Sequence, residues 1–437
     1  MATNSLPLIE VSRLRPGIYV VLDLGWRRHP FPMNSFTLRS PEQIETLRSL
    51  GLEKVRYSPE RSSVPPLPPS AATRPQPAAP PRPAPEVARP ADPEAAKGTV
   101  SVIVAMQLED PIEKQQAMLR ALELRQRQAA QSHQAMLKRI GPEPAEAARV
   151  CEALADELLE WLPQQGEVAL RLLSPGSGDQ PSTHEIGVAS LCLLLGRDCN
   201  MPAPMLRHLV LAALMHDAGK QRVPSFLHED YGQLTEFERQ TYRQHIEFGV
   251  EMARRMELPR EVVEAIAQHH EFADGSGFPH RLDLDALGPV SRALILCNRY
   301  HNLVCPLHVE TGLTPHRALQ RIFREERDRF DPTLLARFVK LLGVYPPGTL
   351  VELTDHRMAI VVASQPGNSL APRVQIVDLP DEARPGLAID LDPAKGVGVR
   401  CGLSPDQLNV RWAARARQIA RSGIAIEPLA EAGRLAA

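Results

Sequence analysis

The stretch from residue 59 to residue 97 limits, more than any other feature, what this chain can fold into. Proline stands at about every third position there, and alanine fills much of the rest. Because proline lacks a backbone donor and fixes φ, such a segment favours extended polyproline II structure and is excluded from a packed core. We therefore expect a semi-rigid linker between two separately folding parts.

The patterns on either side of this linker predict a mainly α protein. We expect the 437 residues to form a small α+β N-terminal domain (1–58), the linker (59–97), a connecting helix (98–144), an all-α domain (145–345) and a small β-containing C-terminal region (346–437). The all-α domain shows alternating helical patterns and no run typical of a β-strand.

Short runs mark the elements of the outer parts. In the N-terminal part, Ile18–Leu22 and Val55–Tyr57 have the character of strands and Pro41–Leu50 that of a helix. Towards the C-terminus, Thr349–Leu353 and Met358–Ala363 alternate like strands, and Pro405–Ser422 favours a helix. The N-terminal part shows no nucleophile or metal cluster, so we expect a regulatory or scaffold module that could bind a signalling partner protein.

The connecting segment predicts one long helix. Leu108–Ile140 is rich in Gln, Arg, Ala and Leu, with charge on most faces and only a weak apolar heptad. The helix therefore either connects two parts of one chain or forms a dimerising coil, which leaves a homodimer open.

Composition and charge exclude several classes of protein. The net charge is −2, so no basic field indicates binding to nucleic acid or to an anionic membrane. The longest apolar runs, Leu191–Leu195 and Leu209–Met215, are far shorter than the ~20 residues that span a bilayer, and the N-terminus lacks a signal pattern. The six cysteines form no C-x-x-C pair, which suits a reducing compartment. We expect a soluble, cytoplasmic protein with no membrane span and no nucleic-acid partner.

Histidines recur on the apolar faces, or at the ends, of the predicted helices in the all-α domain. The residues of this set are His184, His216, Asp217, His245, His269 and His270. Five buried imidazoles and a carboxylate are hard to satisfy by ordinary hydrogen bonds, and together they suit divalent iron, manganese, zinc or nickel. Because the adjacent His269 and His270 point ~100° apart on a helix, two metals are expected rather than one.

A glycine-containing loop follows the histidine pair directly. It reads Glu271-Phe272-Ala273-Asp274-Gly275-Ser276-Gly277-Phe278-Pro279. Gly275 and Gly277 would allow the backbone to approach a ligand closely, and Phe278-Pro279 would supply an apolar surface. We expect this loop to form a wall of the site, with Asp274 holding the loop rather than acting as a base.

At this point the sequence resembles an HD-GYP domain, a branch of the HD phosphohydrolases, over about residues 150–345. His216-Asp217-Ala218-Gly219-Lys220 is similar to the family's H-D-x-G-K motif, and residues 269–279 are similar to H-H-E-x-x-D-G-x-G-Y-P. Tyr345-Pro346-Pro347-Gly348 is similar to its closing turn. Residues 7–58 resemble the small domain often fused upstream of bacterial HD-GYP domains.

The resemblance implies a helical fold with a centre of two or three metals, often iron or manganese, that hydrolyses cyclic di-GMP. One metal would be held by His184, His216, Asp217 and the residue at 298, and the other by Asp217, His245, His269 and His270. Lys220 and Arg292 would contact the phosphate, Asp217 and Lys220 would take part in catalysis, and Gly275, Gly277, Phe278 and Pro279 would line the substrate site.

The sequence departs from the family pattern at the first metal. The usual Asp-x-x-Asp is replaced by Asn298 and His301, and Phe278 stands for the usual Tyr. Gln180 occupies the position where members with a third metal carry Glu, so two metals are expected. Asn298 can ligate through its carbonyl oxygen but brings no charge, and His301, one turn further, could replace it as a ligand.

Three functions follow from these residues. The first is a phosphodiesterase that hydrolyses cyclic di-GMP by two-metal activation of water. The second is a catalytically weakened domain that senses cyclic di-GMP or binds a protein. The third is an HD phosphohydrolase for another nucleotide, against which the glycine loop argues.

Overall fold

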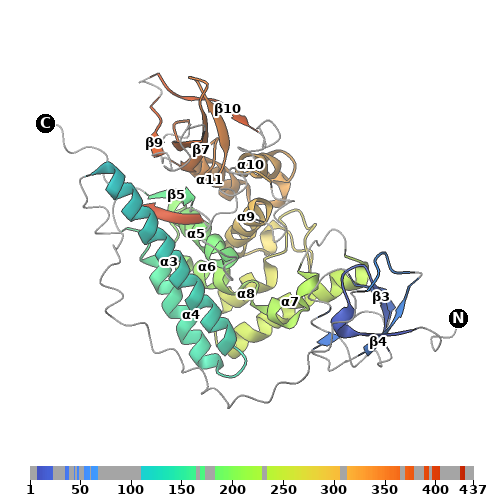
Figure 1. Ribbon diagram of the computed structural model, residues 1–437. Coiled ribbons are helices and arrows are strands. Elements are labelled where there is room, and N and C mark those ends of the chain that lie inside the picture. Colours follow the sequence, from blue (N-terminus) through green and yellow to red (C-terminus); the bar gives the residue numbers. More distant parts are fainter. Residues whose placement is uncertain are drawn as a thin grey trace, which may run out of the picture. The chain divides into compact units, whose positions relative to one another are not determined.

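The computed structural model describes most of the helical part of the chain and portions of the rest. The described residues are 7–22, 35–38, 44, 47–48, 54–59, 61–66, 110–163, 168–172, 183–228, 234–305, 313–364, 370–377, 388–392, 396–403 and 424–428. The chain divides into two compact units, Met1–Lys97 with Lys220–Gln244, and Gly98–Gly219 with His245–Ala437 (Figure 1). No helix among the described residues is both long and apolar enough to cross a membrane.

The first unit contains a small antiparallel sheet. Its strands, in the order β1-β4-β2-β3, are β1 (Leu8–Glu10), β4 (Lys54–Ser58), β2 (Tyr19–Val21) and β3 (Ser35–Thr37). The predicted strands at 18–22 and 55–57 are therefore confirmed. Of the helix predicted over Pro41–Leu50, only residues 44, 47 and 48 are described, and these are helical. Apolar residues of the sheet, such as Ile18 and Val20, form a core of their own.

Two further predictions lie mostly or wholly outside the described residues. These are most of the linker predicted over 59–97, of which only 59 and 61–66 are described, and all of the helix predicted over Pro405–Ser422. The long connecting helix is confirmed as α3 (Pro111–Arg139), which lies beside α4 (Pro144–Leu159) in Figure 1. Its buried face, with Leu122 and Met136, packs inside the unit. That face is therefore not the seam of a dimerising coil.

The body of the second unit is helical, as predicted. Its remaining helices are α5 (Thr183–Asp198), α6 (Ala203–Met215), α7 (Glu236–Arg255, shared with the first unit), α8 (Arg260–Gln268), α9 (Pro289–Val304), α10 (Pro315–Arg324) and α11 (Pro332–Leu342). Local signals explain several starts. Thr235 and Glu238 form a capping box before α7, and Asp331 accepts hydrogen bonds from Thr333 and Leu334 at the start of α11.

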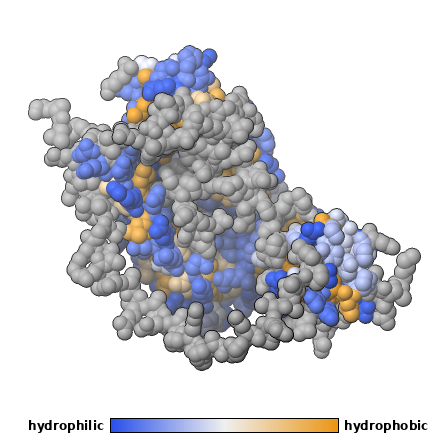
Figure 2. Space-filling model, in the orientation of Figure 1, coloured by the Kyte–Doolittle hydropathy of each residue, from blue (hydrophilic) through white to orange (hydrophobic). Residues whose placement is uncertain are grey.

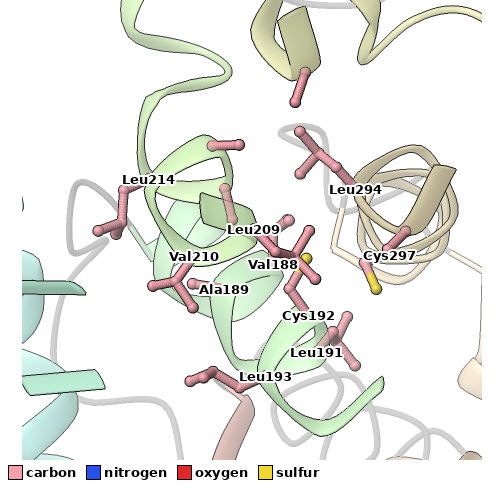
Figure 3. Close-up of a cluster of buried hydrophobic side chains, with 14 of the residues drawn as sticks. Val188, Ala189, Leu191, Cys192, Leu193, Leu209, Val210, Leu214, Leu294 and Cys297 are labelled. Carbon is pink, nitrogen blue, oxygen red and sulfur yellow. The ribbon is translucent and has the colours of Figure 1, made fainter. Parts of the chain in front are cut away.

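The helices α5, α6 and α9 pack around one apolar core. Figure 3 shows Leu294 and Cys297 of α9 beside Val188 and Cys192 of α5. Every residue of α6 from Leu209 to Met215 is fully buried. On the face shown in Figure 2, by contrast, the coloured surface is mostly hydrophilic, with smaller hydrophobic areas. Packing in this core therefore sets the positions of α5 and α6, at whose ends His184 and His216 lie.

One prediction about the second unit was wrong. The region expected to be all-α contributes a strand, β5 (Val168–Leu172), which pairs along its length with β11 (Ile424–Pro428). The other strands of this sheet are β6 (Leu350–Leu353), β7 (Met358–Ala363), β8 (Arg373–Ile376), β9 (Ala388–Asp390) and β10 (Val399–Leu403). Residues 168–171 are all buried, Arg171 included, so β5 lacks the alternation that would have revealed it.

Candidate metal centre

Histidines from four helices meet around one aspartate in the second unit. His184 lies in the first turn of α5, His245 lies within α7, and His269 and His270 follow α8. His216 and Asp217 follow α6, whose last turns are wholly buried, so the chain leaves that helix inside the core. His216 and His245 are 0% exposed, and Asp217 is 6% exposed. The sequence prediction that these side chains point inward is confirmed.

The first group gathers at one oxygen of Asp217. Asp217 Oδ2 lies 3.3 Å from His216 Nε2 and 3.7 Å from His184 Nε2. The two Nε2 atoms are 3.2 Å apart. His184, His216 and Asp217 thus offer three ligand atoms that could hold one metal ion.

The second group gathers at the other oxygen. Asp217 Oδ1 lies 3.7 Å from His269 Nε2 and 3.8 Å from His245 Nε2, and these two nitrogens are 3.3 Å apart. His270 completes this group, whose ligand atoms all lie within 4.8 Å of one another. Asp217 is the one residue common to both groups, so its carboxylate can bridge two ions.

The hydrogen bonds of two of the rings fit a set of metal ligands. His216 Nδ1 lies 2.8 Å from Ala213 O, and His269 Nδ1 lies 2.7 Å from Ile266 O, so each Nδ1–H donates to a carbonyl. In a neutral ring the Nε2 atom then carries a lone pair, and here it faces a carboxylate oxygen and another ring nitrogen. Two ligands bound ~2.1 Å from one cation lie roughly 3.0–3.5 Å apart, close to the separations seen here.

Burial controls which of these rings can carry charge. Burial, reinforced by the nearby His216 and His245, holds the pKa of His269 well below its ordinary value. Burial also opposes a charge on His216, but the adjacent Asp217 carboxylate outweighs it, and the pKa of His216 is raised. His269 therefore stays a neutral nitrogen donor at pH 7, as metal binding requires.

The two residues that depart from the family pattern lie together on α9. Asn298 is 3% exposed, and its Oδ1 accepts a hydrogen bond from Asn302 Nδ2 over 2.9 Å. His301 is 4% exposed, and its Nδ1 lies 3.0 Å from His184 Nδ1. His301 thus contacts the ring nitrogen of His184 that does not face Asp217. It is not a member of either group of three or more potential ligands among the described residues.

The glycine loop is held by its own side chains. Glu271 is fully buried and accepts hydrogen bonds from the backbone N–H groups of His280 and Leu282, over 2.6 and 3.1 Å. Asp274 accepts from the backbone N–H and the hydroxyl of Ser276, over 2.9 and 2.6 Å. Asp274 therefore holds the loop, as expected from the sequence.

Gly277 lies where the loop approaches its own backbone closely. A Cβ at this position would lie 2.4 Å from Glu271 Cα, so the close approach is made to the loop's own backbone. Gly275 takes the left-handed conformation, with φ of 72°. The Phe278 ring stacks on His270, with centroids 4.7 Å apart and planes 18° apart, while Pro279 is exposed. Phe278 thus packs against one of the potential ligands.

The two predicted phosphate contacts differ in their surroundings. Lys220 belongs to the first unit, in a 3₁₀ turn (Ala218–Arg222), and its Nζ lies 5.7 Å from the Tyr242 ring centroid. Arg292 donates to Leu287 O and Leu284 O, each over 2.7 Å, and to Asp331 over 3.0 Å. These bonds tie the loop before α9 to the start of α11, so the geometry favours a structural role for Arg292.

Sequence reasoning overlooked two buried side chains next to the site. His133 of α3 is fully buried, and its Nε2 lies 2.7 Å from Leu214 O, in the last turn of α6 before His216. Its position on the same face as Ala129 and Met136 could have revealed it. Glu271 could be recognised in the sequence only as part of the motif, because nothing local shows that its carboxylate is buried.

Comparisons with known proteins agree with this site. Residues 149–334 match a family model described as HD domain, and residues 7–152 match one described as a domain of unknown function (DUF3391). The cyclic di-GMP phosphodiesterase PA4108 of Pseudomonas aeruginosa is 30% identical over 225 residues, which are 51% of this chain and 54% of that protein.

Two further relatives are more distant. The cyclic di-GMP phosphodiesterase PdeB of Borreliella burgdorferi is 21% identical over 194 residues, 44% of this chain and 51% of that protein. The 3'3'-cGAMP-specific phosphodiesterase 2 of Vibrio cholerae is 28% identical over 126 residues, 28% of this chain and 24% of that protein. The chain thus spans about half the length of the first two relatives, and less of the third.

The segment that matches the HD domain model, residues 149–334, contains all of the clustered His and Asp residues. The loop from Asp274 to Pro279 directly after the histidine pair, and the relatives named as cyclic di-GMP phosphodiesterases, support an HD-GYP domain in this segment.

Proposed function

We propose that this chain is a metal-dependent phosphodiesterase that hydrolyses cyclic di-GMP. The observation that carries the proposal is the Asp217 carboxylate, which presents one oxygen to His184 and His216 and the other to His245 and His269. Such a bridge suits two cations held side by side. The printed names of the Pseudomonas and Borreliella relatives support cyclic di-GMP as the substrate.

The proposed ligands divide into two sets that share Asp217. His184, His216, Asp217 and Asn298 would hold one metal, and Asp217, His245, His269 and His270 the other. Imidazole and carboxylate donors suit iron or manganese, which are the metals we propose. When bound, two such cations acidify a water molecule and offset the negative charge of the phosphodiester.

The residues of the chain have separate tasks in this scheme. Asp217 would be a ligand of both cations, and the carbonyl-bound Nδ1–H groups of His216 and His269 would keep the opposite nitrogens available as ligands. Lys220 would place positive charge on the phosphate. Gly275, Gly277, Phe278 and Pro279 would form the wall against which the nucleotide lies, with Phe278 already packed on His270.

A second function is favoured by Asn298. A neutral amide stands where the family carries a carboxylate, and its oxygen already accepts a hydrogen bond from Asn302. A weaker first site would leave a domain that binds cyclic di-GMP, or a protein, without hydrolysing it. The N-terminal unit is then the proposed place for a signalling partner.

All six cysteines are free thiols, which fits the cytoplasm as the proposed location.

The test is turnover by the full chain loaded with iron or manganese. Cyclic di-GMP and 3'3'-cGAMP are offered in parallel, and the linear dinucleotide and mononucleotide products are separated by chromatography. We expect cyclic di-GMP to be cleaved and Asp217→Ala to lose both activity and most of its metal. Binding of cyclic di-GMP without cleavage would favour the sensor, and preference for 3'3'-cGAMP would correct the substrate.

A further inference from the structure

His301 contacts a potential metal ligand from behind. The His184 and His301 rings meet edge to face, with centroids 4.7 Å apart, and their Nδ1 atoms are 3.0 Å apart. The opposite nitrogen of His184 faces His216 Nε2 at 3.2 Å. His301 therefore engages the side of the His184 ring that points away from the shared carboxylate.

The α5 helix leaves a slot for this ring. Gly187 follows His184 by three residues, so both lie on the same face of α5. A Cβ at Gly187 would lie 2.2 Å from His301 Nε2 and 2.8 Å from its Cδ2. No side chain other than hydrogen fits there while His301 keeps its place. The His301 ring is thus confined between the His184 ring and the α5 backbone, and His301 is only 4% exposed.

The contact between the two Nδ1 atoms has room for one proton. If His184 binds a metal through Nε2, its own proton is on Nδ1, and His301 Nδ1 must accept it. The same pattern holds for His216 and His269, whose Nδ1–H groups donate to Ala213 O and Ile266 O. For His184, in the first turn of α5, His301 has the role that a backbone carbonyl has for His216 and His269.

We propose that His301 is a positioning residue, which fixes the proton and the direction of His184 without binding metal itself. This inference rests on the proposed metal centre and deepens it. It also replaces the expectation that His301 substitutes for Asn298 as a ligand. The two functions differ in what they require of residue 301: a ligand needs a donor atom aimed at the cation, whereas a positioning residue needs only an acceptor beside His184 Nδ1.

In the experiment, the metal-free full chain is titrated with Co²⁺ by calorimetry, and the visible absorption spectrum of the Co²⁺-loaded protein is recorded. His301→Ala and Gly187→Ala should weaken one of two Co²⁺ affinities by about 10- to 100-fold. In His301→Asn the amide oxygen stands near the former Nδ1 and still accepts the hydrogen bond. Its affinity should stay within about threefold of the natural protein, with an unchanged Co²⁺ spectrum.

Gly196→Ala is the matched control for the slot. It adds the same methyl group to the same helix, where the neighbours of a Cβ are all side-chain atoms, the nearest being the flexible end of Leu206 at 2.4 Å. The helix-propensity gain is common to both glycine variants, so the difference between them reports displacement of His301. We expect both Co²⁺ affinities of Gly196→Ala to match those of the natural protein.

Each other outcome has a definite reading. Unchanged affinities in His301→Ala or Gly187→Ala would overturn the positioning role. Loss of affinity in His301→Asn with an altered Co²⁺ spectrum would make His301 a ligand. A natural protein that binds no Co²⁺ would refute the metal centre itself, which is a separate failure. If His301→Ala does not fold by circular dichroism, the Asn and Gly187 variants still decide the question.

Discussion

Replacing Asn298 by aspartate would restore a carboxylate at a position that is 3% exposed. At ~4 Å and an effective dielectric constant of ~20, two unit charges attract by about 4 kcal/mol, and a divalent cation doubles this. Burying the carboxylate costs several kcal/mol, which offsets much of the gain. We expect a net of about 1.4–2.8 kcal/mol, so that the first metal binds about 10- to 100-fold more tightly.

The same substitution should have the opposite effect on the metal-free protein. Without a cation, the new carboxylate at position 298 is buried with one hydrogen-bond donor, from Asn302, and should lower the free energy of unfolding by about 1–3 kcal/mol. The gap between the thermal midpoints of the metal-loaded and chelator-treated forms should therefore widen. Turnover of cyclic di-GMP at limiting metal should rise in parallel.

The assay compares Asn298→Asp with Asn302→Asp, by metal titration and thermal unfolding. Asn302 is one turn further along α9 and exposed, so the control adds the same charge where water screens it. Because Asn302→Asp also removes the donor to Asn298 Oδ1, Asn302→Ala is measured beside it to separate the loss of that bond from the added charge. We expect a change of less than about threefold in its metal affinity. Equal effects of the two variants, or no effect of Asn298→Asp, would refute the assignment of residue 298 to the first metal.

Three further perturbations test the fold around the site. Burial, with a smaller effect of the nearby His216, lowers the pKa of His301 from 6.5 to about 4. As the pH falls, His301 therefore becomes protonated in the unfolded chain at a higher pH than in the folded chain. The metal-free protein should then lose about 3 kcal/mol as the pH falls from 6.5 to 4, and His301→Asn should lose less over this range, by urea unfolding at each pH. Gly277→Ala places a Cβ 2.4 Å from a backbone atom of its own loop and should cost about 1–3 kcal/mol, whereas Gly141→Ala, with open space around it, should not; a similar loss in both would contradict the steric argument. Glu427→Gln leaves the Arg171 guanidinium, 4% exposed, without its 3.3 Å ion partner and should cost about 3 kcal/mol by urea unfolding, while a cost near zero would show that the pair is not needed.

The class of fold and the inward-facing histidines could be predicted from the sequence alone. Helical periodicity placed His184 and His245 on apolar faces, and the apolar run before His216 showed that Asp217 lies at the end of a buried helix. These inferences succeeded because helix starts and apolar faces are local properties, written within a few turns of chain. The strands at 350–353 and 358–363 were found for the same reason.

Which atoms of the site face each other depends on how distant segments pack. Nothing local shows that the two oxygens of Asp217 serve separate pairs of histidines, or that His301 contacts His184 across 117 positions of sequence. Strand β5 was missed because its partner, β11, lies more than 250 residues away and its one charged residue is neutralised there by Glu427. Pairings of this kind arise from the packing of distant segments, and packing is not encoded in any local period of the chain.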